Sequence, residues 1–539
     1  MRSVLGSLRA SARLPDGLVW AVALTCAVVP LWSSFLLPLV DLPQHLHLIS
    51  ALHRLDDPAT LYPEFFARRH ELTPYLGYYY AVDLLQFFFS TDTANRIFLS
   101  GYVVAFPLTF AFLLRSLGRD SWPALLTIPF AYGDSFSWGF INYCSALPWA
   151  LVAAGCFVRA IERVERRRAW ATTLAVALVL VLLFHVQVFA WLGLALPWLL
   201  FTTPAQEGKT WRARVPALLG VLPAVLLFVL WVGLRLGQPA EIAPGQPWHS
   251  WGPLLSPENL AWKSFDQNLA ELVRWRDHSK HFWERVEFPL LAGTTRDGSD
   301  QNAIRLAVLV ALLATLAGLS LGRAADAARG PRRLRLLGLA LLAFLLFFAL
   351  PFDIRGYMYY LNTRYMHLAV PLLLCAVPPL MARVRPLALG AALLVSPLLM
   401  LPLREAFQAF DRESSALLRV AAAAGPKPQV MGLIYNTGSF AVRHPVYVHA
   451  SAVVARLRGG VTNFSFALTP HNPLLYRRTP LPTFASEWRP GQMRWEQQGR
   501  HYDHFVVRGR PPEQVFGARL TNELFVAAEQ HGFFLVRRR

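Results

Sequence analysis

The sequence predicts an all-α polytopic membrane protein that crosses the bilayer about eleven times and ends in a small α+β domain. The first observation is composition. Of 539 residues, 55% are hydrophobic and 16% are charged, whereas a soluble domain usually carries about a quarter charged residues. The second is a series of long apolar runs, and the third is a set of basic clusters between them.

The apolar runs give the expected membrane helices in order, because about 17–25 apolar residues cross a bilayer as a helix. They lie near residues 18–39, 97–114, 121–133, 144–158, 170–184, 186–201, 216–236, 304–322, 335–352, 366–382 and 386–402. No small-residue cleavage site follows the first run, so we expect a retained span and not a removed signal peptide.

The basic clusters between the runs predict the orientation. If all eleven runs span, these clusters fall on one side of the membrane together with the arginines before the first run. They lie at 115–119, 159–168, 209–214, 323–335 and 382–385. The positive-inside rule places them and the N-terminus in the cytoplasm, and the C-terminal region outside. The net charge of +19 therefore reflects topology, and nucleic-acid binding is not expected.

The first outer loop, 40–96, is expected to carry helices that lie along the membrane surface. Residues 75–90 are apolar, but the segment is short, aromatic-rich and contains Asp83. Counting it as a span would place the later basic clusters outside, so we expect an interfacial helix with its tyrosines at headgroup level. Residues 40–74 are expected to add one or two amphipathic surface helices. A second large outer loop covers about 237–303.

Two domains are expected, a transmembrane module over 1–402 and an extracytoplasmic α+β domain over 403–539. After Arg404, prolines, arginines and polar residues become frequent. Short strand-like runs appear at 429–436, 504–509 and 533–539.

The first outer loop opens with a carboxylate and an imidazole, in "LPLVDLPQHLHL". Asp41 precedes a helix with proline in its first turn, so it is suited to cap that helix. Asp41 and His45 are also four residues apart, so on a helix they share one face. Such a pair at the membrane surface is suited to deprotonate an acceptor or to bind a cation. Both interpretations stay open from the residues alone.

The next two outer loops add further polar candidates. Asp134 and Asn142 lie among aromatic residues, where turn and interface roles compete with a functional one. The loop "LPFDIRGYMYYLNTRYMHLAVP" contains Asp353, Arg355 and Arg364. Arginine on the outer side favours a phosphate-bearing ligand, because its guanidinium matches phosphate oxygens in two hydrogen bonds. No phosphate-binding loop, nucleophile elbow, zinc-protease or dinucleotide motif is present, which disfavours an ATP-driven pump.

These features resemble the polytopic lipid-linked-sugar glycosyltransferases of glycosyltransferase superfamily C, which include protein mannosyltransferases and bacterial aminoarabinose transferases. An acid follows the first span ("VDLPQHL"), surface helices end in "NR" at 95–96, and "RYMHLAVP" (364–371) opens a late span. The tail "YDHFVVRG…HGFFLVRR" is also similar to those of bacterial members. The first motif reads DLP where better-known branches carry two acids, and Asp134 lacks an "LPD" context. Metal dependence and acceptor type therefore do not transfer.

The resemblance implies a multi-pass protein of the bacterial inner membrane, with a polyprenyl-phosphate sugar as donor and an envelope glycan, lipid or protein as acceptor. Asp41 would be the catalytic base or a metal-holding acid, and Asp134 a second acid. Arg364 and Arg355 would hold the donor phosphate, and His45, Asn142 and Asp353 would complete the substrate site. No cofactor is fixed by this resemblance, and a divalent ion such as Mg²⁺ or Mn²⁺ stays open.

Three alternatives remain. A transporter or flippase would place ionisable residues at mid-membrane depth, whereas the polar candidates here cluster at the outer ends of the spans. Another envelope-polymer ligase or polymerase would use similar outer-loop arginines and histidines. A non-catalytic assembly protein would not need Asp41.

Overall fold

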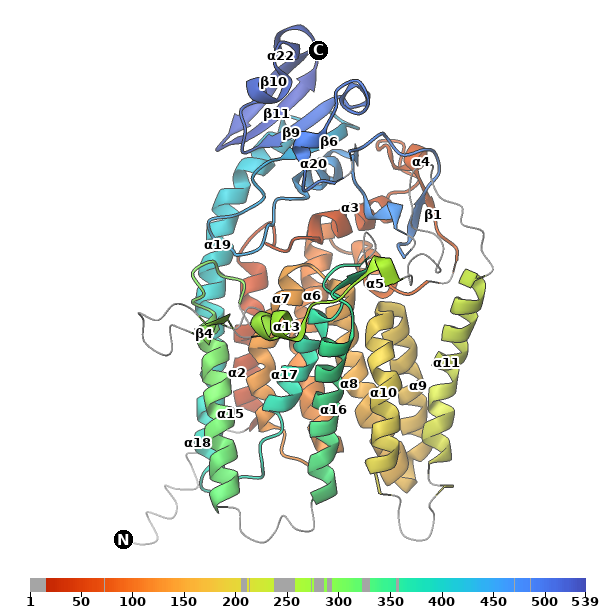
Figure 1. Ribbon diagram of the computed structural model, residues 1–539, viewed down its shortest axis with the longest axis vertical. Coiled ribbons are helices and arrows are strands. Elements are labelled where there is room, and N and C mark those ends of the chain that lie inside the picture. Colours follow the sequence, from red (N-terminus) through yellow and green to blue (C-terminus); the bar gives the residue numbers. More distant parts are fainter. Residues whose placement is uncertain are drawn as a thin grey trace.

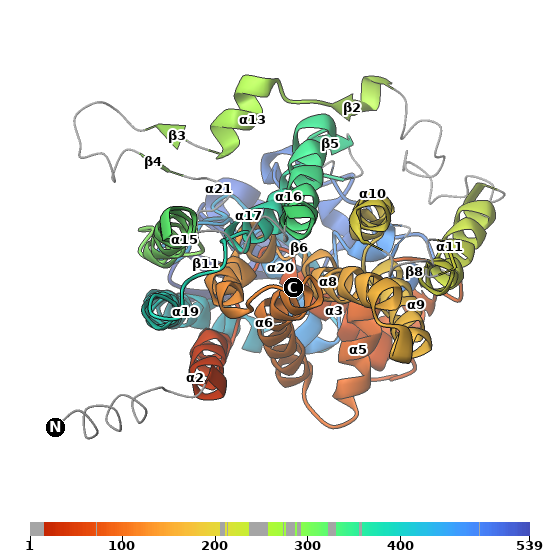
Figure 2. The same cartoon turned by 90° about the horizontal axis from the view of Figure 1, so that it is seen from below.

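The computed structural model describes most of the chain. It covers residues 16–71, 73–204, 211–212, 214–236, 257–272, 274–275, 286–287, 293–321, 330–354, 358–469, 471–484 and 486–539. The chain is mostly helical, and its apolar helices run side by side along the long axis of the molecule (Figures 1 and 2). They are α2 (Asp16–Val28), α6 (Thr91–Ser116), α8 (Ile141–Glu162), α9 (Arg167–Phe184), α10 (Val186–Thr202), α11 (Val215–Leu236), α15 (Gln301–Leu321), α16 (Gly330–Ala349), α17 (Met366–Leu374), α18 (Arg385–Leu393) and α19 (Val395–Ala422).

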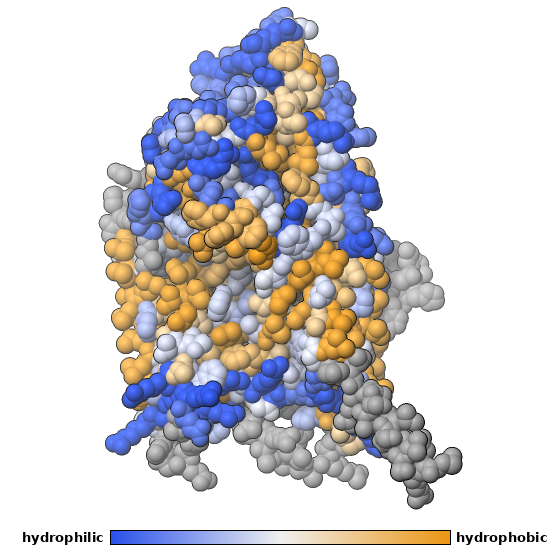
Figure 3. All heavy atoms as spheres, turned by 180° about the vertical axis from the view of Figure 1, so that it is seen from behind, coloured by the Kyte–Doolittle hydropathy of each residue, from blue (hydrophilic) through white to orange (hydrophobic). Residues whose placement is uncertain are grey.

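Within the described ranges, six helices are long and apolar enough to cross a membrane. Figure 3 shows the matching surface, an apolar band between a hydrophilic lower rim and a largely hydrophilic upper part. The protein is therefore an integral membrane protein with several spans. The expected number of eleven stays a prediction.

Three of the expected spans differ from simple helices, and each of them contains proline. The first run ends as a helix at Val28, continues as the 3-10 helix η1 (Val29–Trp32), and leaves 33–40 without helix. The run 121–133 forms the buried 3-10 helix η2 (Trp122–Tyr132), which contains Pro123 and Pro129. The run 366–382 gives only the nine residues of α17, with Pro371 inside it. Proline lacks the N–H that an α-helix needs.

Two described residues of the basic clusters form ion pairs at one end of the bundle. Arg385, the first residue of α18, pairs with Asp16 at 2.9 Å and with Asp120 at 2.7 Å. Arg335 of α16 pairs with Glu162 at the end of α8, at 3.0 Å. These contacts join segments that the alternation of charge had grouped, while the cytoplasmic location of this end stays a prediction.

At the opposite end, the first outer loop forms short helices that do not cross the bundle. They are α3 (Leu42–His53), α4 (Tyr62–Phe65) and α5 (Gly77–Gln86). The ten residues of α5 are too few to span, which agrees with the interfacial helix expected at 75–90. Asp83 of α5 pairs with His53 of α3 at 2.9 Å.

The C-terminal region contains a five-stranded sheet above the bundle (Figure 1). Its order is β10 (Leu524–Gln530), β11 (Phe533–Arg538), β9 (His504–Arg508), β6 (Gln429–Ile434), β7 (Val461–Thr462). The strand β6 runs parallel to β7 and β9, and β9, β11 and β10 are antiparallel. All three strands expected from the sequence are present, whereas β7 and β10 were missed.

The predicted boundary at residue 403 lies inside a continuous helix. The helix α19 starts in the bundle, passes residue 403 and continues to Ala422 against the sheet (Figure 1). In addition, β1 (Phe66–Arg68) of the first outer loop pairs with β8 (Leu474–Tyr476). The C-terminal region is thus attached to the bundle at more than one place, with the helix α20 (Ala450–Arg458) packed on α3.

Candidate functional site

Asp41 accepts the His45 N–H at its backbone carbonyl, at 3.1 Å, and it also contacts the second outer loop. Its side chain makes no capping hydrogen bond to α3, so the capping interpretation is wrong. Its backbone N–H donates to the carbonyl of Trp138 at 3.1 Å. Gly139, with φ of +86°, lets the two chains approach, because a Cβ there would lie 2.8 Å from the Asp41 nitrogen.

Asp134 is linked to Asp41 through the same short segment. It is the first residue of α7 (Asp134–Ser137), and its carbonyl accepts the Trp138 N–H at 2.9 Å. Trp138 therefore connects the backbones of both acids. Asp134 and Thr363 also line one small cavity of about 10 Å³, which brings the second outer loop beside the third.

Each acid contacts a histidine of the C-terminal region. His444 Nε2 lies 3.0 Å from Asp134 Oδ1, and His449 Nε2 lies 3.5 Å from Asp41 Oδ1. The side chains of Asp134 and Asp41 are 19% and 22% exposed, whereas those of the two histidines are only 6% and 7% exposed. A ligand from outside can thus reach the carboxylates while the imidazoles lie behind them.

Arg364 packs against Phe140 of the second outer loop. Its guanidinium carbon is 3.8 Å from the centre of the Phe140 ring, and Tyr143 of α8 donates a hydrogen bond to its carbonyl at 2.6 Å. No carboxylate in the described ranges forms an ion pair with Arg364, although Asp41 is close enough to interact with it electrostatically.

Hydrogen-bond donors converge around this guanidinium. His185 Nδ1 accepts the Gln187 N–H at 3.2 Å, and His185 Nε2 lies 3.3 Å from Arg364 Nη1. Arg364 Nη2 donates to the Tyr359 carbonyl at 3.0 Å. Arg364 Nε and the Tyr75 hydroxyl are buried and lack hydrogen-bond partners among the described residues. Two buried donors without an acceptor favour an anion.

Two of the expected substrate residues contact other parts of the protein. His45 Nδ1 lies 2.7 Å from the Tyr79 hydroxyl, and burial lowers the pKa of His45 to about 4, although the charge of Asp41 opposes this. Asn142 Oδ1 accepts the Tyr78 N–H at 3.3 Å. His45 thus borders Asp41 as a neutral ring, and Asn142 holds the start of α5.

The remaining two expected residues are Asp353 and Arg355. Asp353 lies in β5 (Asp353–Ile354), which pairs with β2 (Leu260–Ala261), and its Oδ1 is buried without a partner in the described part of the chain. Arg355 lies outside the described residues, so its predicted role with the donor phosphate stays a prediction.

The sequence analysis missed His444, His449 and Glu487, and it did not name His185. The only signal for the first two was a pair of histidines in "RHPVYVHA", which is common in structural loops. His185 does occupy a helix end, since its Nδ1 caps α10, and it faces Arg364 as well.

Among the described residues, no group of three or more His, Cys, Asp or Glu side chains is arranged to hold a metal ion. A metal-holding role of Asp41 and a contribution of Mg²⁺ or Mn²⁺ stay predictions.

Comparison with known proteins adds the following. No protein-family model matches the chain, and no curated protein matches it. Two solved structures are similar, ArnT from Cupriavidus metallidurans in the apo state and ArnT from Cupriavidus metallidurans bound to undecaprenyl phosphate. Each is 13% identical and covers 97% of both chains, with TM-scores of 0.42 and 0.43. Both neighbours are aminoarabinose transferases, one of the groups that the sequence resembles.

Proposed function

We propose that the protein transfers a sugar from a polyprenyl-phosphate donor to an acceptor on the outer face of the membrane. The observation that carries this proposal is an accessible carboxylate, Asp41, within electrostatic reach of a buried arginine, Arg364, that forms no ion pair in the described ranges. A transferase of this kind needs a base for the acceptor and a cation for the leaving phosphate.

The proposed reaction is a single displacement at the anomeric carbon. Asp41 takes the proton of the acceptor hydroxyl, and the acceptor oxygen forms a bond to the anomeric carbon. The bond from that carbon to the phosphate oxygen breaks, and the polyprenyl phosphate leaves with the bonding electron pair. Arg364 and the Tyr75 hydroxyl would stabilise the phosphate charge, and so would His185 in the tautomer with its proton on Nε2. Asp134 would lie beside the reacting groups as a second carboxylate.

The donor half of this proposal is tested by binding of undecaprenyl phosphate to the purified protein in lipid nanodiscs. Arg364→Lys is expected to weaken binding about tenfold or more, because an ammonium cannot reproduce the forked hydrogen bonds of a guanidinium. The control is Arg478→Lys, whose parent side chain is 49% exposed on the surface. Equal binding by Arg364→Lys and the wild type would contradict a phosphate site at Arg364.

The transfer half is tested with undecaprenyl-phosphate donors that carry different radiolabelled sugars. Incubation with an envelope extract should release undecaprenyl phosphate and move the label to an acceptor for at least one sugar. Label that stays on the lipid with every donor would argue against transferase activity.

A further inference from the structure

A loop of the C-terminal region supplies both histidines of the candidate site. We call residues 436–449, between β6 and α20, the histidine loop. His444 contacts Asp134, and its ring packs against Trp138 with centroids 5.5 Å apart. His449 contacts Asp41 from the last residue before α20. The two histidines are five residues apart and reach two acids that are 93 residues apart in the sequence.

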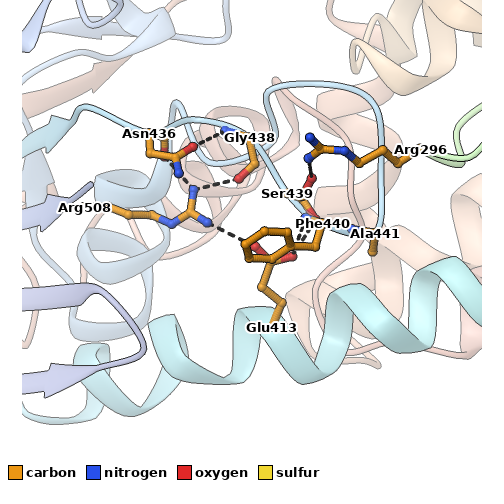
Figure 4. Close-up of polar contacts among 8 residues, drawn as sticks. All are labelled: Arg296, Glu413, Asn436, Gly438, Ser439, Phe440, Ala441 and Arg508. Atoms are coloured by element: carbon orange, nitrogen blue, oxygen red, sulfur yellow. Dashed lines mark hydrogen bonds and ion pairs between the residues drawn. The ribbon is translucent and has the colours of Figure 1, made fainter. Parts of the chain in front are cut away.

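A buried ion pair between Arg508 and Glu413 holds the start of the histidine loop (Figure 4). Arg508 of β9 donates to Glu413 of α19 at 3.0 Å and to the Gly438 carbonyl at 2.7 Å, and it also donates to the Asn436 carbonyl. Glu413 accepts the Ser439 hydroxyl at 2.6 Å and the Phe440 N–H at 3.1 Å. The start of the loop is thereby fastened to both a membrane helix and the sheet.

The middle of the histidine loop forms backbone hydrogen bonds with the large outer loop. Arg443 N–H donates to the Thr294 carbonyl at 3.0 Å, and Arg296 N–H donates to the Ala441 carbonyl at 3.2 Å. Thr294 in turn bonds Ser137, at the end of α7, with its hydroxyl at 2.9 Å. The loop is therefore placed by three separate parts of the chain.

His449 lies between two carboxylates. Its Nε2 is 3.5 Å from Asp41 Oδ1, and its Nδ1 is 2.7 Å from Glu487 Oε2. The His449 and Glu487 side chains are each 7% exposed. Burial opposes a charge on His449, but Glu487 and Asp41 outweigh it and raise its pKa to about 9. The other titratable group facing His449 is His45, which is neutral.

We propose that His449 is a positioning residue that, as a cation held by Glu487, orients the Asp41 carboxylate toward the acceptor, so that the C-terminal region completes the active site. This inference rests on the proposed transferase function for the role of Asp41. The arrangement of charges itself does not depend on the identity of donor or acceptor.

The charge of His449 also predicts a direction with pH. A histidine whose pKa is raised by folding contributes stability that is fully present below its unfolded pKa of about 6.5 and is lost as the pH rises through its folded value. For His449 the window lies between about 6.5 and about 9. The orientation of Asp41 should therefore persist at neutral pH and fail in alkali.

The charge is measured by ¹⁵N spectroscopy of histidine-labelled full-length protein in nanodiscs. The chain has 15 histidines, so the His449 signal is assigned by its loss in His449→Gln. We expect a doubly protonated ring at pH 7.5 with a midpoint near pH 9. Glu487→Gln should lower that midpoint by about one to three pH units, because one opposite charge is removed. The control is Glu496→Gln, whose parent side chain is 72% exposed.

A neutral His449 at pH 7.5, or a midpoint that Glu487→Gln does not move, would overturn the inference. If transfer is found, the alkaline limb of its pH–rate profile should shift by the same amount in Glu487→Gln. Loss of a purely structural residue would lower activity equally at every pH. If the spectroscopic result holds and no donor is used, the transferase proposal fails and the charge arrangement stands.

Discussion

At the scale of single residues, the variant Asp41→Asn distinguishes a catalytic role of Asp41 from a structural one. The amide keeps an oxygen for His449 and the backbone contacts to Trp138 are unchanged, so we expect a folded protein in the membrane fraction. The amide cannot take a proton, and loss of a general base costs about 10²–10⁴-fold in rate. The measurement is label transfer from the undecaprenyl-phosphate donor.

The matched control for this variant is Asp266→Asn, which changes an exposed acid of α13 (Phe265–Leu272). It should retain normal transfer. Near-normal turnover of Asp41→Asn would show that Asp41 is not the general base. Asp134 would then be the next candidate for that role.

His45 and His47 predict acid sensitivity of the first outer loop. Burial lowers the pKa of both histidines to about 4. Between that value and the unfolded value of about 6.5, the unfolded chain binds protons that the folded chain does not. Stability should therefore fall with decreasing pH, by at most about 1.4 kcal/mol per pH unit for each histidine.

The measurement is thermal unfolding in nanodiscs at pH 7.5 and pH 5. His47→Asn should reduce the difference between the two melting temperatures, since one of the two groups is removed. A wild-type melting temperature that does not change with pH would contradict the neutral, buried state of these rings.

Some residues of the site could be predicted because they break a local pattern. Asp41 ends a long uncharged run, and Arg364 precedes a late apolar run on the side without basic clusters. His449 and Glu487 break no such pattern. His449 contacts Asp41 across 408 positions of sequence and Glu487 across 38 positions. Hydropathy and charge periodicity carry no information on which residues of distant segments meet.

At the scale of elements, the approach of the first and second outer loops depends on Gly139. An alanine there would strain a backbone with φ of +86° and place its Cβ 2.8 Å from the Asp41 nitrogen. We expect Gly139→Ala to destabilise the protein by about 1–3 kcal/mol and to displace Asp41 from His449. Thermal unfolding and the His449 signal measure both effects.

Gly101→Ala is the matched control, because Gly101 lies within α6 with nothing within 4 Å of an added Cβ. It should be neutral or slightly stabilising. Equal behaviour of the two alanine variants would show that the outer loops do not require this close approach.

The elements show where hydropathy succeeds and where it stops. Apolar runs located most of the bundle helices, because length and composition decide burial in a bilayer. They did not distinguish η2 or the short α17 from full spans, because both runs are as apolar as their neighbours. Prolines do not distinguish them either, since α6, α8, α10 and α11 each contain an internal proline and remain helical. The sheet was located in part, because β9 and β11 are rich in aromatic and β-branched residues, whereas β7 has only two residues.

At the scale of the whole molecule, the sidedness of the two ends is a direct prediction. Arg335 and Arg385 of the basic clusters lie at one end and the candidate site lies at the other, as the positive-inside rule requires for an outer-face enzyme. A reporter active only outside the cytoplasm should be active when fused after Arg539. The same reporter fused after Arg166 should be inactive.

The opposite result for both fusions would invert the topology and place the site in the cytoplasm. Activity from both fusions would contradict the odd number of spans that is predicted between these two points. Either outcome would leave the internal geometry of the site intact and change the compartment of its substrates.

Because α19 is continuous, it couples the membrane part of the molecule to the candidate site. One helix joins the last predicted span to Glu413, which anchors the histidine loop. Eleven residues separate residue 402 from Glu413, a rise of about 16 Å at about 1.5 Å per residue. A tilt of about 10° in the membrane half would therefore move Glu413 by about 3 Å, a displacement comparable to the His449–Asp41 separation. A lipid chain wedged against α19 would thus change the geometry at Asp41 without touching it.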